Sequence, residues 1–257
     1  MAARRTVREH KLERAARAAG RRPGGSLHPA VSIRDGLVVL LALTSGAVDA
    51  VTFVRLGNVF SSVITGNLAL LGLAAGERHG ALAIGSGLAL GAYAAGVLAG
   101  GALAGPMEGG QPAWPRRTTV TMAAELVVLA GFSAGWLGAD GHPSDGVRLT
   151  LLALTAAAMG MQSAAVRLLG QMSTTYLTST LIGIFQSIGA RRVPPDWQRS
   201  TAVLIAFVAG AAFGVAGAIA SAALVPVAVM VPLAVVILCA ARSASLRLPR
   251  DQGGHGS

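Results

Sequence analysis

Eight apolar stretches follow one another along the chain, and most of the short segments between them contain charged residues, proline or glycine. They are Leu37–Val54, Val59–Gly76, Ala81–Gly105, Thr118–Ala139, Arg148–Leu169, Met172–Gly189, Thr201–Ala220 and Ala222–Ala241. Most of them approach or reach the length of about 20 residues that a helix needs to cross a lipid bilayer. The charge-free run 200–241 is long enough for two such helices. The pattern predicts an all-α, polytopic membrane helix bundle.

Two of these stretches, Val59–Gly76 and Met172–Gly189, differ from the rest because their first halves are rich in hydroxyl and amide side chains. Residues 57–68 and 170–181 also resemble each other at a constant offset of 113. Both segments have a glycine, an adjacent amide side chain, a hydroxyl pair and a threonine followed by a small and then a polar residue. This similarity predicts an internal duplication.

The duplication gives two homologous membrane halves, residues 35–139 and 148–241, in which Gly96 is matched with Gly214. We expect the two polar stretches to enter and leave on one side as short re-entrant or broken helices. Six spans then remain, three in each half. An odd number of crossings inverts the second half relative to the first, and inverted repeats recur among transporters.

The distribution of arginine favours six spans over eight. With six spans, Arg116, Arg117 and Arg167 lie on the cytoplasmic side, together with the tails 1–34 and 242–257. With eight spans, which stay the alternative, the same arginines lie outside, against the positive-inside bias. We therefore expect a multi-pass protein of the cell membrane with both termini in the cytoplasm.

Composition and charge narrow the class of partner. Hydrophobic residues make up 53% of the chain and charged residues 12%, and residues 1–34 carry +7 of the formal charge of +10. A basic tail beside a first span sets orientation and attracts anionic lipid. Because this tail has no aromatic residue to stack on bases, we expect no nucleic acid partner. The single cysteine, Cys239, excludes an internal disulfide, and we expect no metal and no cofactor.

Three ionisable residues, Asp49, Glu125 and Arg167, fall inside or at the edge of apolar stretches. Charges within the membrane are costly and usually face the bundle interior or water. Asp49 is the leading candidate for a proton or cation site. The alternative is a structural carboxylate that pairs with arginine or caps the chain break near residue 57. Arg167 is either an anchor at the cytoplasmic edge or a contact for substrate or Asp49.

The triplets Thr65-Gly66-Asn67 and Thr178-Ser179-Thr180 combine hydroxyl, amide and small residues at the expected helix breaks. Such side chains can satisfy unwound backbone or bind a solute. They can equally join neighbouring helices by hydrogen bonds. If the halves are inverted, Thr65 and Thr178 should approach each other, with Asn67, Thr180 and Asp49 around one cavity.

The segments Gly46–Ala50, Gly57–Phe60 and Thr65–Leu68 resemble the YoaK family of bacterial integral membrane proteins. In the second half, Gln162–Ala164, Arg167 and Thr174–Thr178 resemble it too, whereas Ser179 departs from the expected Thr-Gly-Thr. The similarity covers roughly residues 35–245; it implies a multi-pass membrane protein and supplies no substrate. The residues proposed for a substrate or ion pathway are Asp49, Asn58, Thr65, Gly66, Asn67, Gln162, Arg167, Thr174, Thr175, Thr178 and Thr180.

No enzymatic activity is expected. Residues 131–135 match G-x-S-x-G, but that motif requires a strand-to-helix turn and here lies within an apolar helical stretch. The first functional hypothesis is a secondary transporter or channel-like carrier of a small solute, proton-coupled through Asp49. The second is a non-transporting scaffold or regulator that associates with itself or a partner through glycine-rich helix faces.

Overall fold

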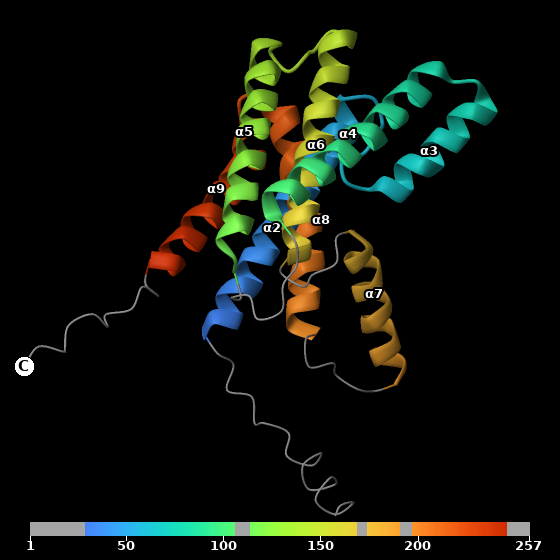
Figure 1. The fold of residues 1–257 in the computed structure, drawn as a ribbon. Helices are drawn as coiled ribbons and strands as arrows, with labels where there is room; N and C mark the ends of the chain where they lie inside the picture. The colour runs from blue at the N-terminus through green and yellow to red at the C-terminus, as the bar shows by residue number, and fades with distance from the viewer. Residues whose placement is uncertain (1–28, 106–113, 169–173, 191–196, 246–257) are drawn as a thin grey trace, which may run out of the picture. The chain divides into compact units, whose positions relative to one another are not determined.

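The computed structural model describes residues 29–105, 114–168, 174–190 and 197–245, which form helices and turns without a strand. By its contacts the chain divides into two units, residues 1–33 and 34–257. The helices pack against one another within the second unit. The described helices are α2 (Pro29–Arg55), α3 (Ile64–Glu77), α4 (Gly80–Ala104), α5 (Arg116–Gly138), α6 (Asp145–Leu168), α7 (Thr174–Gly189), α8 (Trp197–Ala220) and α9 (Leu224–Ser245) (Figure 1).

Six of these helices, namely α2, α4, α5, α6, α8 and α9, are long and apolar enough to cross a membrane. The other two are shorter, with 14 residues in α3 and 16 in α7. At a rise of 1.5 Å per residue they extend about 21 and 24 Å, less than the hydrocarbon core of about 30 Å. The predicted all-α fold, with six spans and two short helices at the polar stretches, is confirmed.

The spanning helices expose large apolar side chains on their outer faces. Leu98 on α4, Val127 on α5 and Ile219 on α8 are each more than 70% exposed. Water-soluble proteins rarely expose extended apolar surface of this kind without a partner. These faces are suited to contact with lipid.

Glycines bring α2 and α8 into backbone contact. A Cβ atom on Gly46 or on Gly210 would lie 2.0 Å from a carbonyl oxygen of the other helix, so no side chain fits at either position. Small residues of this kind let membrane helices approach closely. Further along, the Arg55 guanidinium donates a hydrogen bond of 2.6 Å to the Ala218 carbonyl. The two helices therefore run in the same direction.

The packing of α4 against α6 repeats this arrangement. A Cβ atom on Gly96 would lie 2.0 Å, and one on Gly160 2.2 Å, from a carbonyl oxygen of the other helix. Gly85 lies near Leu152, and Gly96 lies near Gly160. Because the residue numbers on α4 and α6 increase together from the first contact to the second, α4 and α6 also run in the same direction.

The two glycine-packed pairs share one spacing in the sequence. Gly46 and Gly160 stand 114 positions apart, and so do Gly96 and Gly210, which occupy equivalent places in the two pairs. The sequence alone matched Gly96 with Gly214. The backbone contacts correct that match by one helical turn, because Gly96 and Gly210 are the residues whose added Cβ atoms would meet a carbonyl oxygen at 2.0 Å.

The helices α2 and α6 run in opposite directions. Near Gly57, which follows α2, a Cβ atom would lie 3.8 Å from the guanidinium of Arg148 in the first turn of α6. Nearer the start of α2, the Leu41 carbonyl accepts a hydrogen bond from Gln162, which lies toward the end of α6. The two contacts fix the antiparallel arrangement.

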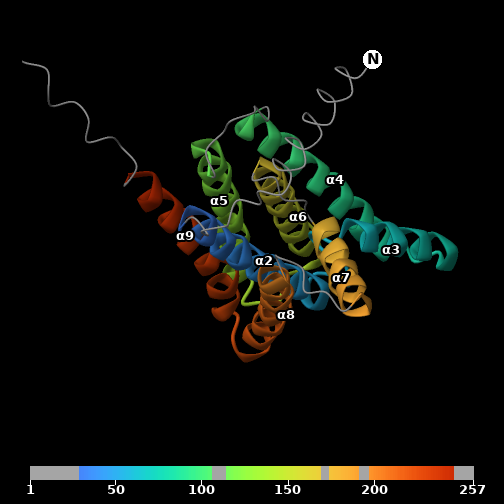
Figure 2. The same ribbon diagram turned by 90° about the horizontal axis from the view of Figure 1, so that it is seen from below.

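Each short helix packs on the helix that follows it. α3 lies beside α4, and α7 lies beside α8, as Figure 2 also shows. α5 packs against α6 and α9, and its Trp136 indole donates a hydrogen bond of 2.9 Å to the carbonyl of Ala222, in the turn before α9.

Candidate functional site

The chain leaves helical geometry between Arg55 and Ile64 and remains largely buried there. Gly57 has φ +113°, a conformation that glycine adopts at little cost, and Asn58 follows with φ +60°. Val59, Ser61 and Ser62 are buried although they lie outside a helix. Non-helical backbone within a membrane protein needs other partners for its polar groups. Two side chains supply them.

Asp49 is the first of these side chains. Its Oδ1 atom accepts hydrogen bonds from the Ser61 N–H (2.9 Å), the Ser61 hydroxyl (2.8 Å) and the Ser62 N–H (2.7 Å). Its Oδ2 atom accepts one from the Ser62 hydroxyl at 2.5 Å. With four donors and only 3% exposure, the carboxylate ties the non-helical segment to α2. This bonding corresponds to the structural alternative, a carboxylate that caps the chain break.

Asn67 is the second. Its side-chain oxygen accepts a hydrogen bond from the Phe60 N–H at 3.0 Å, and its amide nitrogen donates one to the Phe60 carbonyl at 2.6 Å. Both backbone polar groups of Phe60 are thereby satisfied by one buried side chain. Gly66 leaves room beside Phe60, because an added Cβ would lie 3.3 Å from its ring. The Thr65-Gly66-Asn67 triplet therefore holds the start of α3 against the segment before it.

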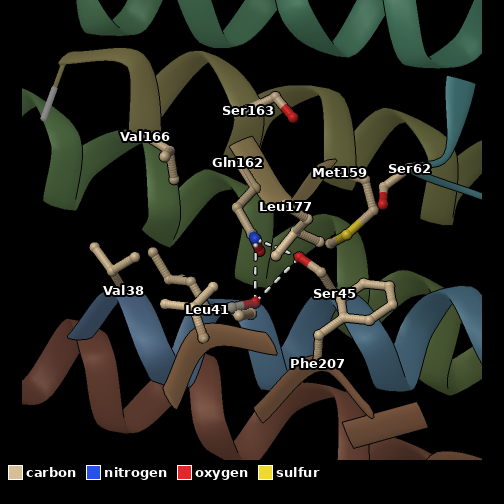
Figure 3. A pocket seen from close by; sticks show the side chains of 12 residues that line it. Val38, Leu41, Ser45, Ser62, Met159, Gln162, Ser163, Val166, Leu177 and Phe207 are labelled. Atoms are coloured by element: carbon tan, nitrogen blue, oxygen red, sulfur yellow. Dashed lines mark hydrogen bonds between the residues drawn. The ribbon is translucent and has the colours of Figure 1, made fainter. Parts of the chain in front are cut away.

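A small cavity of about 70 Å³ lies between α2, α6, α7 and α8 (Figure 3). Its polar lining comes from Ser45, Ser62, Gln162 and Ser163. The apolar lining residues are Val38, Leu41, Ala42, Met159, Val166, Leu177, Val203 and Phe207. One water needs about 10–15 Å³ on this scale, so the cavity has room for a few waters or one small solute. Among the described residues, no acidic or basic side chain lines it.

Gln162 is the most constrained polar group of the cavity. Its amide nitrogen donates hydrogen bonds to the Leu41 carbonyl (3.3 Å) and to the Ser45 hydroxyl (2.8 Å), which fixes the side chain against α2 (Figure 3). Its amide oxygen is buried and has no hydrogen-bond partner among the described residues. Such a group is costly to leave unpaired. It therefore offers a site for a donor from water or a solute.

Comparison with known proteins places the chain in a family. A family model described as "Protein of unknown function (DUF1275)" matches residues 37–241. The chain belongs to the DUF1275 family. It is similar to the UPF0700 transmembrane protein YoaK of Bacillus subtilis (strain 168), with 31% identity over 164 residues, 63% of this chain and 70% of that protein. No solved structure matches. The resemblance to the YoaK family is confirmed.

The DUF1275 chain brings together only part of the pathway predicted from its sequence. Gln162 lines the cavity, and Asp49 holds Ser62 at its edge. Thr65 and Thr178 are exposed and do not line it. Asn58 and Arg167 are likewise exposed, and Thr180 is buried but away from the lining. The side chains of Thr174 and Thr175 lie outside the described residues.

Sequence reasoning did not place Ser45, Ser62 and Ser163 at the cavity. Ser62 belongs to the hydroxyl pair of the first motif, and Ser163 follows Gln162 directly. Ser45 precedes the packing glycine Gly46, a position that fixes its height on α2. In the sequence, the position of Ser45 directly before the motif glycine Gly46 could have pointed to the cavity. Serine beside glycine is, however, common in membrane helices.

Glu125 lies elsewhere, on the buried face of α5. The residue is fully buried, and neither of its carboxylate oxygens has a hydrogen-bond partner among the described residues. In the described part of the chain no group of three or more histidine, cysteine, aspartate or glutamate residues comes together as metal ligands would. Glu125 thus differs from Asp49, which has four donors.

Proposed function

We propose that this DUF1275 protein is a membrane carrier for a small, uncharged polar solute that passes through the cavity between α2, α6, α7 and α8. The cavity and the unpaired amide oxygen of Gln162 are the observation that carries the proposal. Sites for small molecules are concave, mostly apolar and provided with a few fixed polar groups. This cavity has that composition.

The lining indicates the chemistry of the solute. The Ser45 and Ser62 hydroxyls already donate to the Leu41 carbonyl and to Asp49, so toward a solute they offer acceptor oxygens, and the Gln162 oxygen can accept a hydrogen bond as well. Because no charged side chain lines the cavity, an ion would lose its hydration there without a counter-charge, which is costly. An amide or a polyol fits these groups better.

We propose further that α2–α5 and α6–α9 are inverted repeats. The antiparallel course of α2 and α6, and the equivalent glycine contacts at a spacing of 114, support this arrangement. In carriers built this way, one packed body rocks against the other around a site near the middle of the membrane. In this proposal the two moving bodies are the pairs α2/α8 and α4/α6, because the two helix backbones within each pair are in direct contact.

The scaffold hypothesis receives less support. The glycines with the closest backbone approaches, Gly46, Gly96, Gly160 and Gly210, are used inside the bundle and not on an outer face. Asp49, in turn, is better explained as the support of Ser62 than as the coupling site, because its four hydrogen bonds occupy both oxygens.

The carrier proposal predicts that water reaches the side chain of Ser45. A cysteine at this position (Ser45→Cys, in a Cys239→Ala background that removes the exposed native thiol) should react with a small water-soluble thiosulfonate. Thr44→Cys is the control, because Thr44 is fully buried on the same turn of α2 and should stay unreactive. Equal protection of both cysteines would favour the scaffold.

The same labelling tests the orientation that we propose, with both termini in the cytoplasm of a cell-membrane protein and the basic N-terminal tail against anionic lipid. Cysteines in place of Gln111 and Pro195 should react from the cytoplasmic side, and one in place of Ser144 from outside. Labelling of positions 111 and 195 from opposite faces would contradict the inverted six-span arrangement.

A further inference from the structure

The Glu125 carboxyl group is isolated within the helix bundle. It lies on α5 about two and a half turns from the start of that helix at Arg116, and its side chain is fully buried. Neither oxygen accepts a hydrogen bond, and no arginine, lysine or histidine of the described residues lies within ion-pair distance. A buried carboxylate without donors or a counter-charge is strongly disfavoured. A bound proton removes that cost.

Charged groups on the packed neighbours of α5 lie toward helix ends. On α5 itself, Arg116 and Arg117 precede Glu125 by about two turns. α4 carries no charged residue between Gly80 and Ala104. The titratable or charged residues on the other two neighbours are Asp145, Arg148 and Arg167 on α6, and Cys239 and Arg242 on α9. Arg167 and Arg242 are exposed in the last turns of their helices.

Two buried threonines lie between Glu125 and the start of α5. Thr118, Thr121 and Glu125 follow at intervals of three and four residues, so they share one face of the helix. All three are fully buried. The Thr118 hydroxyl has no partner among the described residues, and the Thr121 hydroxyl donates to the Arg117 carbonyl at 3.0 Å. A hydroxyl group can accept a hydrogen bond and donate one at the same time.

We propose that Glu125 is a proton-binding site, reached from the Arg116 end of α5 along the Thr121 and Thr118 hydroxyls. One proton converts the carboxylate into a neutral carboxylic acid, and no other bond changes. A metal cation is a poor alternative, because Na⁺-like or Ca²⁺-like ions need several oxygen ligands, and Glu125 belongs to no group of three or more histidine, cysteine, aspartate or glutamate side chains among the described residues. Coupling of this proton to solute movement rests on the proposed function, whereas proton binding itself does not.

The test is reaction of the purified full-length protein with dicyclohexylcarbodiimide, an apolar reagent that adds a protonated carboxylic acid across its C=N bond. Peptide mass spectrometry should find the adduct at Glu125. Its yield should fall as pH rises, ultimately by about tenfold per pH unit, because the protonated fraction of one acid falls at that rate. Sodium chloride in place of potassium chloride should not protect the residue.

A second carboxylate of the same chain and a variant of Glu125 serve as controls. Asp49 should give no adduct, because four donors occupy its oxygens. Glu125→Gln should abolish the adduct without lowering the melting temperature, since the neutral amide resembles the protonated acid. The proposal is overturned if Glu125 is unmodified at mildly acidic pH, if its labelling does not change with pH, or if sodium protects it. None of these outcomes depends on whether the protein transports a solute.

Discussion

Asp49→Ala is expected to lower the free energy of unfolding by about 4 kcal/mol, because two buried backbone N–H groups lose their acceptor and each costs about 1–3 kcal/mol unpaired. The N–H groups belong to Ser61 and Ser62, whose hydroxyls lose the same partner. Asp49→Asn keeps one acceptor oxygen and should cost about half as much. Equilibrium unfolding in mixed detergent micelles measures both effects.

Asp140→Asn is the matched control for the Asp49 substitutions. Asp140 is exposed and has φ +49°, a conformation that asparagine tolerates well. Its replacement should change the free energy of unfolding by less than about 0.5 kcal/mol. If Asp49→Ala were as mild as this control, the carboxylate would not be the support of the non-helical segment, and a functional role for its charge would regain support.

Gly96→Ala should lower the free energy of unfolding by about 3 kcal/mol, because the added methyl group would overlap the backbone of α6 and force the helices apart. The Cβ atom would lie 2.0 Å from the Ala157 carbonyl oxygen. Gly210→Ala should have a similar cost, since its Cβ would lie 2.0 Å from the Leu43 carbonyl oxygen. The same unfolding measurement compares the two.

Gly91→Ala provides the control on the same helix. Gly91 has no atom within 4 Å of an added Cβ, and alanine is favoured over glycine in a helix by about 1 kcal/mol. The control should therefore be neutral or stabilising. A destabilisation equal to that of Gly96→Ala would show that any substitution in α4 is harmful and that close backbone packing is not the cause.

The membrane architecture could be predicted from the sequence because the signal is local. The charge-free run 200–241 and the polar beginnings of two apolar stretches are visible without knowledge of any contact. Helix length alone then separates α3 and α7 from the six spans.

The roles of individual residues could not be predicted in the same way. The chain has to turn back after Arg55 before Ser61 and Ser62 reach Asp49, and the sequence does not show where that turn directs the donors. The match of Gly96 with Gly214 instead of Gly210 has a related cause. In a helix rich in small residues, a shift of about one turn superposes similar side chains, and only backbone contact selects the register.

Solute flux through proteoliposomes tests the carrier most directly. Vesicles with the wild-type protein, Gln162→Leu or Gln186→Leu are exposed to gradients of urea, acetamide and glycerol, and volume changes are followed by light scattering. Gln186, exposed on α7, receives the same substitution as Gln162 but lies outside the cavity. We predict that at least one of the three solutes crosses faster with wild-type protein and with Gln186→Leu than through protein-free vesicles, and that Gln162→Leu abolishes the gain. Equal rates in all vesicles for every solute, or full activity of Gln162→Leu, would contradict the proposal that the protein is a carrier.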